Sequence, residues 1–298
     1  MKLITQPDDG LTPLLMAIKR AKKSIDIVIF RFDRSELEKA LAQAVGRGVA
    51  VRALVAQTNR GGEKRLRKLE MTFLDKGITV CRTADDLTRY HGKMMIVDGT
   101  LYVLAFNFTE LDINRSRSFG VATREPALTK AAGALFEADA TRQPYEPTHK
   151  RLVVSPESAR GILNDFIKGA RKELLIYDPK VSDRAILKLL RDRVEAGVTV
   201  RVIGTVAKGA DGIAAMKLPG MRLHCRAIVR DRKTLFIGSQ SLRRQQIDGR
   251  REIGVIVPQA KIAAAVAQIF EQDWKRAPAK KIKKIEKLEE AVREAVAT

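Results

Sequence analysis

Apolar and polar residues follow a pattern of helical and strand-like segments that occurs twice along this chain. In the first half, residues 14–32 carry apolar positions at helical spacing and then a short apolar run, and residues 35–55 repeat that order. Residues 159–179 and 182–204 have the same order in the second half. Each pattern is typical of an amphipathic helix followed by a buried strand. The chain is therefore predicted to contain an internal duplication.

The two copies also share their turns. Gly48 and Gly197 occupy the same point in the similar segments GRGVAVRALV and EAGVTVRVIG, where a helix ends and a Val-rich strand begins. Asp98-Gly99 and Asp231-Arg232-Lys233 separate apolar runs and are typical of hairpin turns. Each half closes with a strand and a helix, at residues 119–139 and 253–274. We therefore expect an α/β fold in which mixed central sheets are flanked by helices.

Three regions are expected from this organisation. A segment with two prolines, residues 143–151, is the expected boundary between a first half at residues 1–145 and a second half at 151–274. Residues 275–298 form a basic tail with apolar residues at helical spacing. This tail fits an amphipathic helix on an anionic lipid surface. A C-terminal helix that packs on the protein or lies in solvent fits equally well.

The charge of the chain points to anionic partners. The net charge is +21, and residues 1–274 carry +17 of it. Such a field attracts nucleic acid, anionic lipid surfaces or phosphorylated small molecules, without choosing among them. One basic segment, residues 59–70, contains Arg60, Lys64, Arg65, Arg67 and Lys68. It could flank a cleft for an anionic substrate, or it could be a solvated helix face.

Other features of the composition narrow the class of protein. Cys81 and Cys225 each lie in an apolar, strand-like run, which favours buried free thiols over a disulfide. No ligand spacing connects the cysteines with the three histidines, so we expect no metal site. No apolar run approaches the roughly 20 residues of a membrane span, and the N-terminus lacks the apolar core of a signal peptide. We expect a cytoplasmic protein without a transmembrane segment, with peripheral membrane contact as an open alternative.

Two of the three histidines lie at matching places in the two repeats and share the same neighbours. Both fit the pattern His-x-(Lys/Arg)-x4-Asp, as His91, Lys93 and Asp98 in the first half and as His224, Arg226 and Asp231 in the second. In a strand, residues i and i+2 point to the same face, so each histidine is expected to project beside its own cation. A cation can hold phosphate oxygens, while an imidazole can attack phosphorus or move a proton. The paired motifs therefore predict phosphate chemistry.

The repeated motif resembles that of the phospholipase D superfamily, over residues 14–274. The resemblance implies two α/β/α sandwich halves related by pseudo-twofold symmetry, with the two motifs meeting in one site. It implies a phosphodiesterase or phosphatidyltransferase that needs no metal or other cofactor, because Lys93 and Arg226 supply positive charge. One histidine forms a covalent phospho-histidine and the other protonates the leaving alcohol. The superfamily includes phospholipases D, cardiolipin synthases, phosphatidylserine synthases and nucleases.

The sequence departs from the family pattern in both halves. The family lysine of the second motif is Arg226, which keeps the charge but changes its shape. The Gly-Ser-x-Asn segment survives in part: Asn107 and Thr109 remain in the first half, whereas Gly238 and Ser239 remain in the second, where Ser241 replaces Asn. The Glu-x-Gly segment is intact at Glu252, but Ser118 occupies its place in the first half. A site pooled from both halves could still hold Asn107, Ser239 and Glu252 beside the histidines.

The roles follow from these features. His91 is expected to be the nucleophile, since its motif is better preserved, and His224 the general acid. Glu252 is expected to orient one histidine through a ring nitrogen, or else to pair with a nearby arginine. Asp98 and Asp231 lie near the turns, so we expect them to hold structure and not to carry protons. His149 is expected to be an ordinary surface histidine.

Three functions remain open at this point. The first is phospholipid hydrolysis or transfer, the second is cleavage of DNA or RNA, and the third is phosphate binding without catalysis in a degenerate member of the superfamily. In each, the partner is an anionic phosphodiester.

Overall fold

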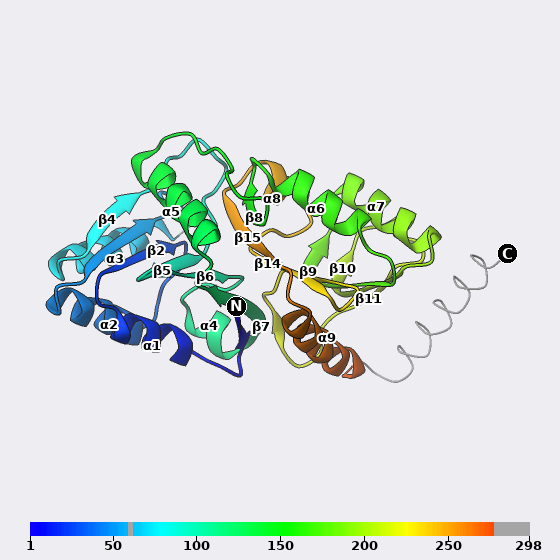
Figure 1. The fold of residues 1–298 in the computed structure, drawn as a ribbon, viewed down its shortest axis with the longest axis horizontal. Helices are drawn as coiled ribbons and strands as arrows, with labels where there is room; N and C mark the ends of the chain where they lie inside the picture. Colours follow the sequence, from blue (N-terminus) through cyan, green and yellow to red (C-terminus); the bar gives the residue numbers. More distant parts are fainter. Residues whose placement is uncertain (59–61, 277–298) are drawn as a thin grey trace.

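Two similar mixed β-sheets, each covered by helices, make up the protein (Figure 1). The structure is a computed structural model that describes residues 1–58 and 62–276. The helix expected in the basic tail therefore falls almost wholly outside the described residues, and Arg60 of the basic segment lies outside them too.

The first sheet is built mainly from the first half of the chain. Its strands are β1 (Lys2–Gln6), β2 (Ser24–Ile29), β3 (Ala50–Val55), β4 (Thr79–Arg82), β5 (Met94–Val97), β6 (Thr100–Leu104) and β7 (Ser116–Thr123), joined by β12 (Arg222–Leu223) from the second half. The helices of this half are α1 (Thr12–Arg20), α2 (Ser35–Gly46), α3 (Glu63–Asp75), α4 (Glu110–Asn114) and α5 (Pro126–Thr141).

The second sheet repeats the first. Its strands are β8 (Leu152–Ser155), β9 (Glu173–Val181), β10 (Thr199–Val206), β11 (Ala214–Met216), β13 (Ala227–Arg230), β14 (Thr234–Gly238) and β15 (Glu252–Val257). The helices are α6 (Ala159–Lys168), α7 (Arg184–Glu195), α8 (Arg244–Asp248) and α9 (Ala260–Lys275).

The strand orders of the two sheets correspond one to one. The first runs β1-β7-β6-β5-β2-β3-β4 and the second β8-β15-β14-β13-β9-β10-β11. In both, the last three strands are parallel and the others antiparallel, so both sheets are mixed. The predicted duplication and the fold class are therefore confirmed. The copies differ at two connections: helix α3 lies between β3 and β4, whereas β10 continues to β11 without a helix, and β12 lies between β11 and β13, whereas β4 continues to β5 without a strand.

The hydrophobic core has three parts. One lies under α1, α2 and α3, and another under α6 and α7. The third contains buried residues of α5 and α9 together with residues from both sheets, so it forms the junction of the two halves. Phe136 and Phe270, at matching places in α5 and α9, are buried in it. Burial of both helices at the junction makes the two halves one packed unit.

Two buried ion pairs cross this junction in matching positions. Arg117 in β7 donates from Nε to Asp273 in α9 at 2.8 Å, and Arg251 donates from Nε to Asp139 in α5 at 3.0 Å. In each pair the arginine comes from one half and the carboxylate from the other. All four side chains are buried, so each charge depends on its partner from the opposite half.

The predicted hairpin turns are present, and their aspartates serve the loops beside them. Asp98 and Asp231 have positive φ angles of 46° and 53° in the turns between β5 and β6 and between β13 and β14. Asp98 accepts hydrogen bonds from the backbone N–H groups of residues 22–24, and Asp231 does the same for residues 171–173. Both carboxylates therefore tie a hairpin to the loop before a central strand.

The two cysteines are free, but their burial differs. Cys225 is fully buried in the junction core. Cys81 is only partly buried, so the expectation of burial is wrong for it, because β4 is the edge strand of the first sheet. No helix in the described part of the chain is long and apolar enough to cross a membrane.

Candidate active site

Each histidine motif lies against a strand of the opposite half. The backbone N–H of His91 donates to the carbonyl of Arg251 at 2.7 Å, just before β15. The N–H of His224 donates to the carbonyl of Arg117 in β7 at 3.2 Å, and β12 pairs with β7 immediately before it. These crossed contacts bring both histidines to the junction of the halves.

The segments that carry the motifs are not strands, although the sequence pattern predicts strands there. Residues 91–93 and 224–226 precede β5 and β13, since both segments leave their own sheet to reach the other half. Gly92 permits the close approach, because a Cβ at this position would lie 2.5 Å from the side chain of Ile253 in β15. The packing between the halves therefore takes the place of strand geometry in aligning His91 with Lys93.

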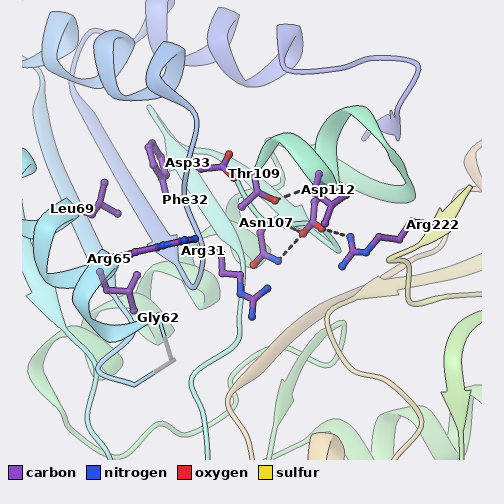
Figure 2. A pocket seen from close by; sticks show the side chains of 12 residues that line it. Arg31, Phe32, Asp33, Gly62, Arg65, Leu69, Asn107, Thr109, Asp112 and Arg222 are labelled. Atoms are coloured by element: carbon purple, nitrogen blue, oxygen red, sulfur yellow. Dashed lines mark hydrogen bonds and ion pairs between the residues drawn. The ribbon is translucent and has the colours of Figure 1, made fainter. Parts of the chain in front are cut away.

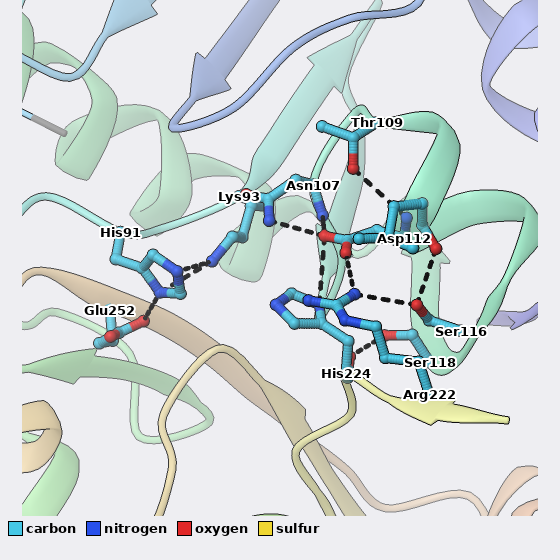
Figure 3. Close-up of polar contacts among 11 residues, drawn as sticks. His91, Lys93, Asn107, Thr109, Asp112, Ser116, Ser118, Arg222, His224 and Glu252 are labelled. Carbon is cyan, nitrogen blue, oxygen red and sulfur yellow. Dashed lines mark hydrogen bonds and ion pairs between the residues drawn. The ribbon is translucent and has the colours of Figure 1, made fainter. Parts of the chain in front are cut away.

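His91 lies between a carboxylate and an ammonium group (Figure 3). Its Nδ1 is 2.8 Å from Oε2 of Glu252, which comes from β15 of the other half. The Nζ of Lys93 lies 2.8 Å from both ring nitrogens, and the Phe30 ring packs edge-on at 4.5 Å between ring centres. All of these polar side chains are buried. A hydrogen bond to Glu252 would keep the proton on Nδ1, so that Nε2, which faces Nζ of Lys93, would carry the lone pair for attack.

His224 has a different carboxylate partner, which the sequence reasoning missed. Its Nδ1 lies 3.2 Å from Oδ2 of Asp112, in the short helix α4, within ion-pair distance but without the geometry of a hydrogen bond. Asn107 holds the same oxygen through its backbone N–H at 2.9 Å and its side-chain Nδ2 at 2.6 Å. The one available signal was the place of Asp112, five residues after Asn107. At the matching place in the second half, Gln246 accepts a hydrogen bond from the N–H of Ser241.

The cation of the second motif is buried, and two of its nitrogen atoms lack hydrogen-bond partners among the described residues. Arg226 is 9% exposed, and its Nε and Nη1 have no hydrogen-bond partner in the described residues. Two unpaired N–H groups of one buried guanidinium are costly unless a ligand accepts from them. Each of these N–H donors could bind an oxygen of an anionic ligand.

The electrostatics of the site favour neutral histidines when no substrate is bound. Burial lowers the pKa of His91 well below its ordinary value, and the nearby cations of Lys93 and Arg226 lower it further. Burial, Arg226 and Lys93 lower the pKa of His224 in the same way, and His91 itself contributes to that shift. Both cations and both histidines therefore share one electrostatic environment. An anionic phosphodiester would offset the cations and make protonation of a histidine easier.

The remaining predicted residues divide between the site and its frame. Asn107 is buried at the site, while Thr109 caps α4 by accepting the N–H of Asp112 at 3.3 Å. Ser239 accepts the N–H of Ile253 at 3.0 Å and thereby holds β15 beside Glu252. Asp98 and Asp231 lie at the hairpin turns, outside these contacts. His149 is partly buried, 3.7 Å from Glu125, and makes no contact with the other two histidines.

Ser118 and Ser241, which stand where the family pattern has other residues, each donate a hydrogen bond within the protein. Ser118, in the place of the missing glutamate, donates from its hydroxyl to the carbonyl of His224 at 2.7 Å. Ser241, in the place of the missing asparagine, donates to Asp178.

In the basic segment, Lys64, Arg65 and Lys68 are exposed, whereas Arg67 pairs with Glu70 at 2.8 Å. Among the residues described, no cluster of His, Cys, Asp and Glu side chains could hold a metal ion.

Two solved structures are similar to this arrangement. Polyphosphate kinase from Porphyromonas gingivalis matches with a TM-score of 0.74 and 21% identity, over 91% of this chain and 49% of the kinase, so this chain spans about half the length of that protein. Phosphatidylserine synthase from Haemophilus influenzae Rd KW20 matches with a TM-score of 0.68 and 12% identity, over 92% of this chain and 85% of the synthase. At these identities the likeness concerns the fold alone.

Sequence comparison identifies the family. No curated protein matches the sequence significantly. A family model described as "Cardiolipin synthase, PLD-like domain" matches residues 14–140 and 163–274, which include both histidine motifs. Because this match covers most of the chain and the fold repeats as the family pattern implies, the chain belongs to the phospholipase D-like family of the cardiolipin synthase type.

Proposed function

We propose that this protein is a phosphodiesterase or phosphatidyltransferase that cleaves a phosphodiester through a covalent phospho-histidine, without a metal. The observation that carries the proposal is the meeting of two buried histidine–cation units from the two halves, with the guanidinium of Arg226 unsatisfied among the described residues. The proposed catalytic residues are His91, Lys93, His224 and Arg226.

In the first step, Nε2 of His91 attacks phosphorus while Glu252 holds the proton on Nδ1. The P–O bond to the leaving alcohol breaks, and protonated His224 gives its proton to that oxygen. Lys93 and Arg226 bind the non-bridging oxygens, where charge builds up in the transition state. Asp112 orients His224 and stabilises its charged form, as Glu252 does for His91.

In the second step, His224 removes a proton from water or from an acceptor alcohol. The oxygen attacks phosphorus, the P–N bond to His91 breaks, and the product is a phosphate monoester or a new phosphodiester. We assign the nucleophile to His91 because its carboxylate contact is the shorter one, at 2.8 Å against 3.2 Å for His224.

The test is direct detection of the intermediate. A 4-nitrophenyl phosphodiester is added in the presence of a chelator, the reaction is stopped at alkaline pH, and the protein is digested and analysed by mass spectrometry. Nitrophenolate leaves without a proton, so His224→Ala should accumulate phosphorylated His91, while His91→Ala should show none. Phosphorylation at His224 would reverse the assignment. Turnover with no adduct in any variant would refute the covalent mechanism.

The family description favours a phospholipid substrate, and fold likeness to a phosphatidylserine synthase agrees with this. Peripheral contact with an anionic membrane surface belongs to the same proposal. The positive charge of residues 1–274 favours a second candidate, a nuclease that binds the backbone of DNA or RNA. Parallel assays with mixed phospholipid micelles and with a plasmid, each with chelator, separate the two. Phosphate binding without turnover of either would indicate the degenerate, non-catalytic alternative.

A further inference from the structure

A pocket of about 300 Å³ opens beside the proposed active site (Figure 2). Asn107 and Asp112 belong to its lining, and these are the residues that contact one another beside His224. The opposite wall is the start of α3, from Gly62 to Leu69. The second half has no helix at the matching connection between β10 and β11, where every residue is described. The pocket is therefore an addition to one copy of the duplicated fold.

Two arginines in the pocket have charges without an ion-pair partner in the part of the chain that the structure describes. Arg31 and Arg65 are exposed and line the pocket, and neither has a hydrogen bond or ion pair to a described residue. The guanidinium of Arg31 lies 5.7 Å from the centre of the Phe30 ring. Both are therefore available to an anion.

The other charged groups of the lining already have partners. Arg222 pairs with Asp112 at 2.5 Å and also donates to the hydroxyl of Ser116. Asp33 accepts the backbone N–H of Glu110 at 2.8 Å. These contacts leave Arg31 and Arg65 as the unpaired charges of the described lining.

The helix on the opposite wall adds to this positive potential. The 13-residue helix α3 begins after Gly62, and no side chain of a described residue caps its first N–H groups. Gly62 itself lines the pocket, so this helix end faces the cavity. Uncapped N–H groups and the helix dipole favour an anion at such an end.

Polar and apolar features of the walls limit what the pocket can hold. Asn107 is 3% exposed, and its Oδ1 has no hydrogen-bond partner among described residues, so it can accept from a hydroxyl group of a ligand. Phe32, Leu66 and Leu69 supply apolar wall. A cavity of this size holds a small phosphorylated group, whereas a nucleic-acid strand needs a groove that continues past it.

We propose that this pocket binds a second phosphoryl group of the substrate, a phosphate monoester attached to the same molecule as the scissile phosphodiester. Arg31 and Arg65 bind its oxygens and the start of α3 faces it, while Asn107 accepts from a neighbouring hydroxyl. This inference rests on the proposed function, because it assumes that the scissile phosphate lies between His91 and His224.

The first test measures binding without catalysis. Calorimetry compares propane-1,3-diyl bisphosphate with propyl phosphate, which has the same carbon chain and a single phosphate. We expect the bisphosphate to bind at least about 10-fold more tightly, and Arg31→Ala/Arg65→Ala to abolish that preference. The matched control, Arg171→Ala/Lys172→Ala, also removes two exposed charges, but in the loop before β9, beside the hairpin turn of Asp231. It should keep the preference.

The second test separates this inference from the proposed function. Two chromogenic diesters are compared, 4-nitrophenyl propyl phosphate and its analogue with a phosphate on the third carbon. The ratio of their kcat/KM values should fall at least about 10-fold in the double pocket variant and stay constant in the control. Turnover with an unchanged ratio would overturn the pocket inference and leave the phosphodiesterase proposal standing.

Two further outcomes are informative. If neither diester is cleaved but the binding preference depends on Arg31 and Arg65, the catalytic proposal fails and the pocket inference holds. A short oligonucleotide serves as a competitor in the calorimetry. One outcome is that the oligonucleotide binds through these two arginines while the bisphosphate binds no more tightly than propyl phosphate. In that case the pocket serves a nucleic-acid backbone and the inference is wrong.

Discussion

The two halves of this protein share one fold and have kept different residues of the family pattern at the candidate site. The second half provides Glu252 on β15, and the matching residue of the first half is Ser118. The first half provides Asp112 on α4, and the matching residue of the second half is Gln246. Each half therefore supplies one carboxylate, from a different element, to the histidine of the other half. Loss of a residue in one repeat does not mean loss of the site, because the site draws on both.

Replacing either histidine should have the largest effect, because each half supplies one of the two. We expect His91→Ala and His224→Ala each to lower phospholipid turnover at least about 1,000-fold, since one removes the nucleophile and the other the acid. With a 4-nitrophenyl diester, His224→Ala should recover part of its rate of nitrophenolate release in the first turnover, because that leaving group needs no proton, although the second step still needs His224. Burst kinetics with this diester and steady-state kinetics with the phospholipid check this. Equal rates for both single variants and the unmodified protein would contradict a site shared by the halves.

The two ion pairs across the junction should differ in their contribution to stability. Asp273→Asn leaves Arg117 buried with the exposed Asp8 as its one other carboxylate partner among the described residues, so we expect it to lower the free energy of unfolding by about 3–5 kcal/mol. Asp139→Asn should cost less, because Arg251 also pairs with Glu157. Urea denaturation measures both. Glu38→Gln, which removes a partly exposed pair with Lys76, is the control and should cost at most about 1 kcal/mol. Equal losses for Asp273→Asn and Asp139→Asn would count against this asymmetry.

Exchange of the carboxylates sharpens the comparison of the two sites. Asp112→Asn should lower kcat roughly 10- to 100-fold with little change in KM, because Asp112 acts through His224 and not on the substrate. Adding Ser118→Glu should restore part of that loss by giving the first half the counterpart of Glu252. The pH dependence of kcat is the decisive readout. If Asp112 is only structural, the rate falls without any shift of the His224 limb.

The smallest expected effect is on stability at acidic pH. Both buried histidines have pKa values below the ordinary value of about 6.5, so the unfolded chain binds more protons below that pH. Stability should therefore fall as pH decreases below 6.5, by up to about 1.4 kcal/mol per pH unit for each histidine. In denaturation between pH 7 and 5.5, His91→Gln should show a shallower decline. An identical slope would place the pKa of His91 near its unfolded value.

The repeat, the mixed sheets and the hairpin turns could be predicted because they follow from local patterns. Gly48 and Gly197 have positive φ angles at the ends of matching helices, and Asp98 and Asp231 occupy matching turns, as their sequence positions suggested. The approach of Glu252 to a histidine was suggested by a short motif. Asp112 could not be chosen in this way, because its place five residues after Asn107 was the one signal and the same short helix also contains the carboxylate of Glu110.

Composition, periodicity and motif spacing were sufficient to predict the duplicated α/β fold and to single out the two histidine–cation pairs. The tertiary structure alone decided that each motif crosses to the opposite half, that Asp112 faces His224, and that α3 closes a pocket beside the site. The physical reason is that local patterns depend on neighbours along the chain. Contacts between β7, β12 and β15 depend instead on how two finished sheets pack.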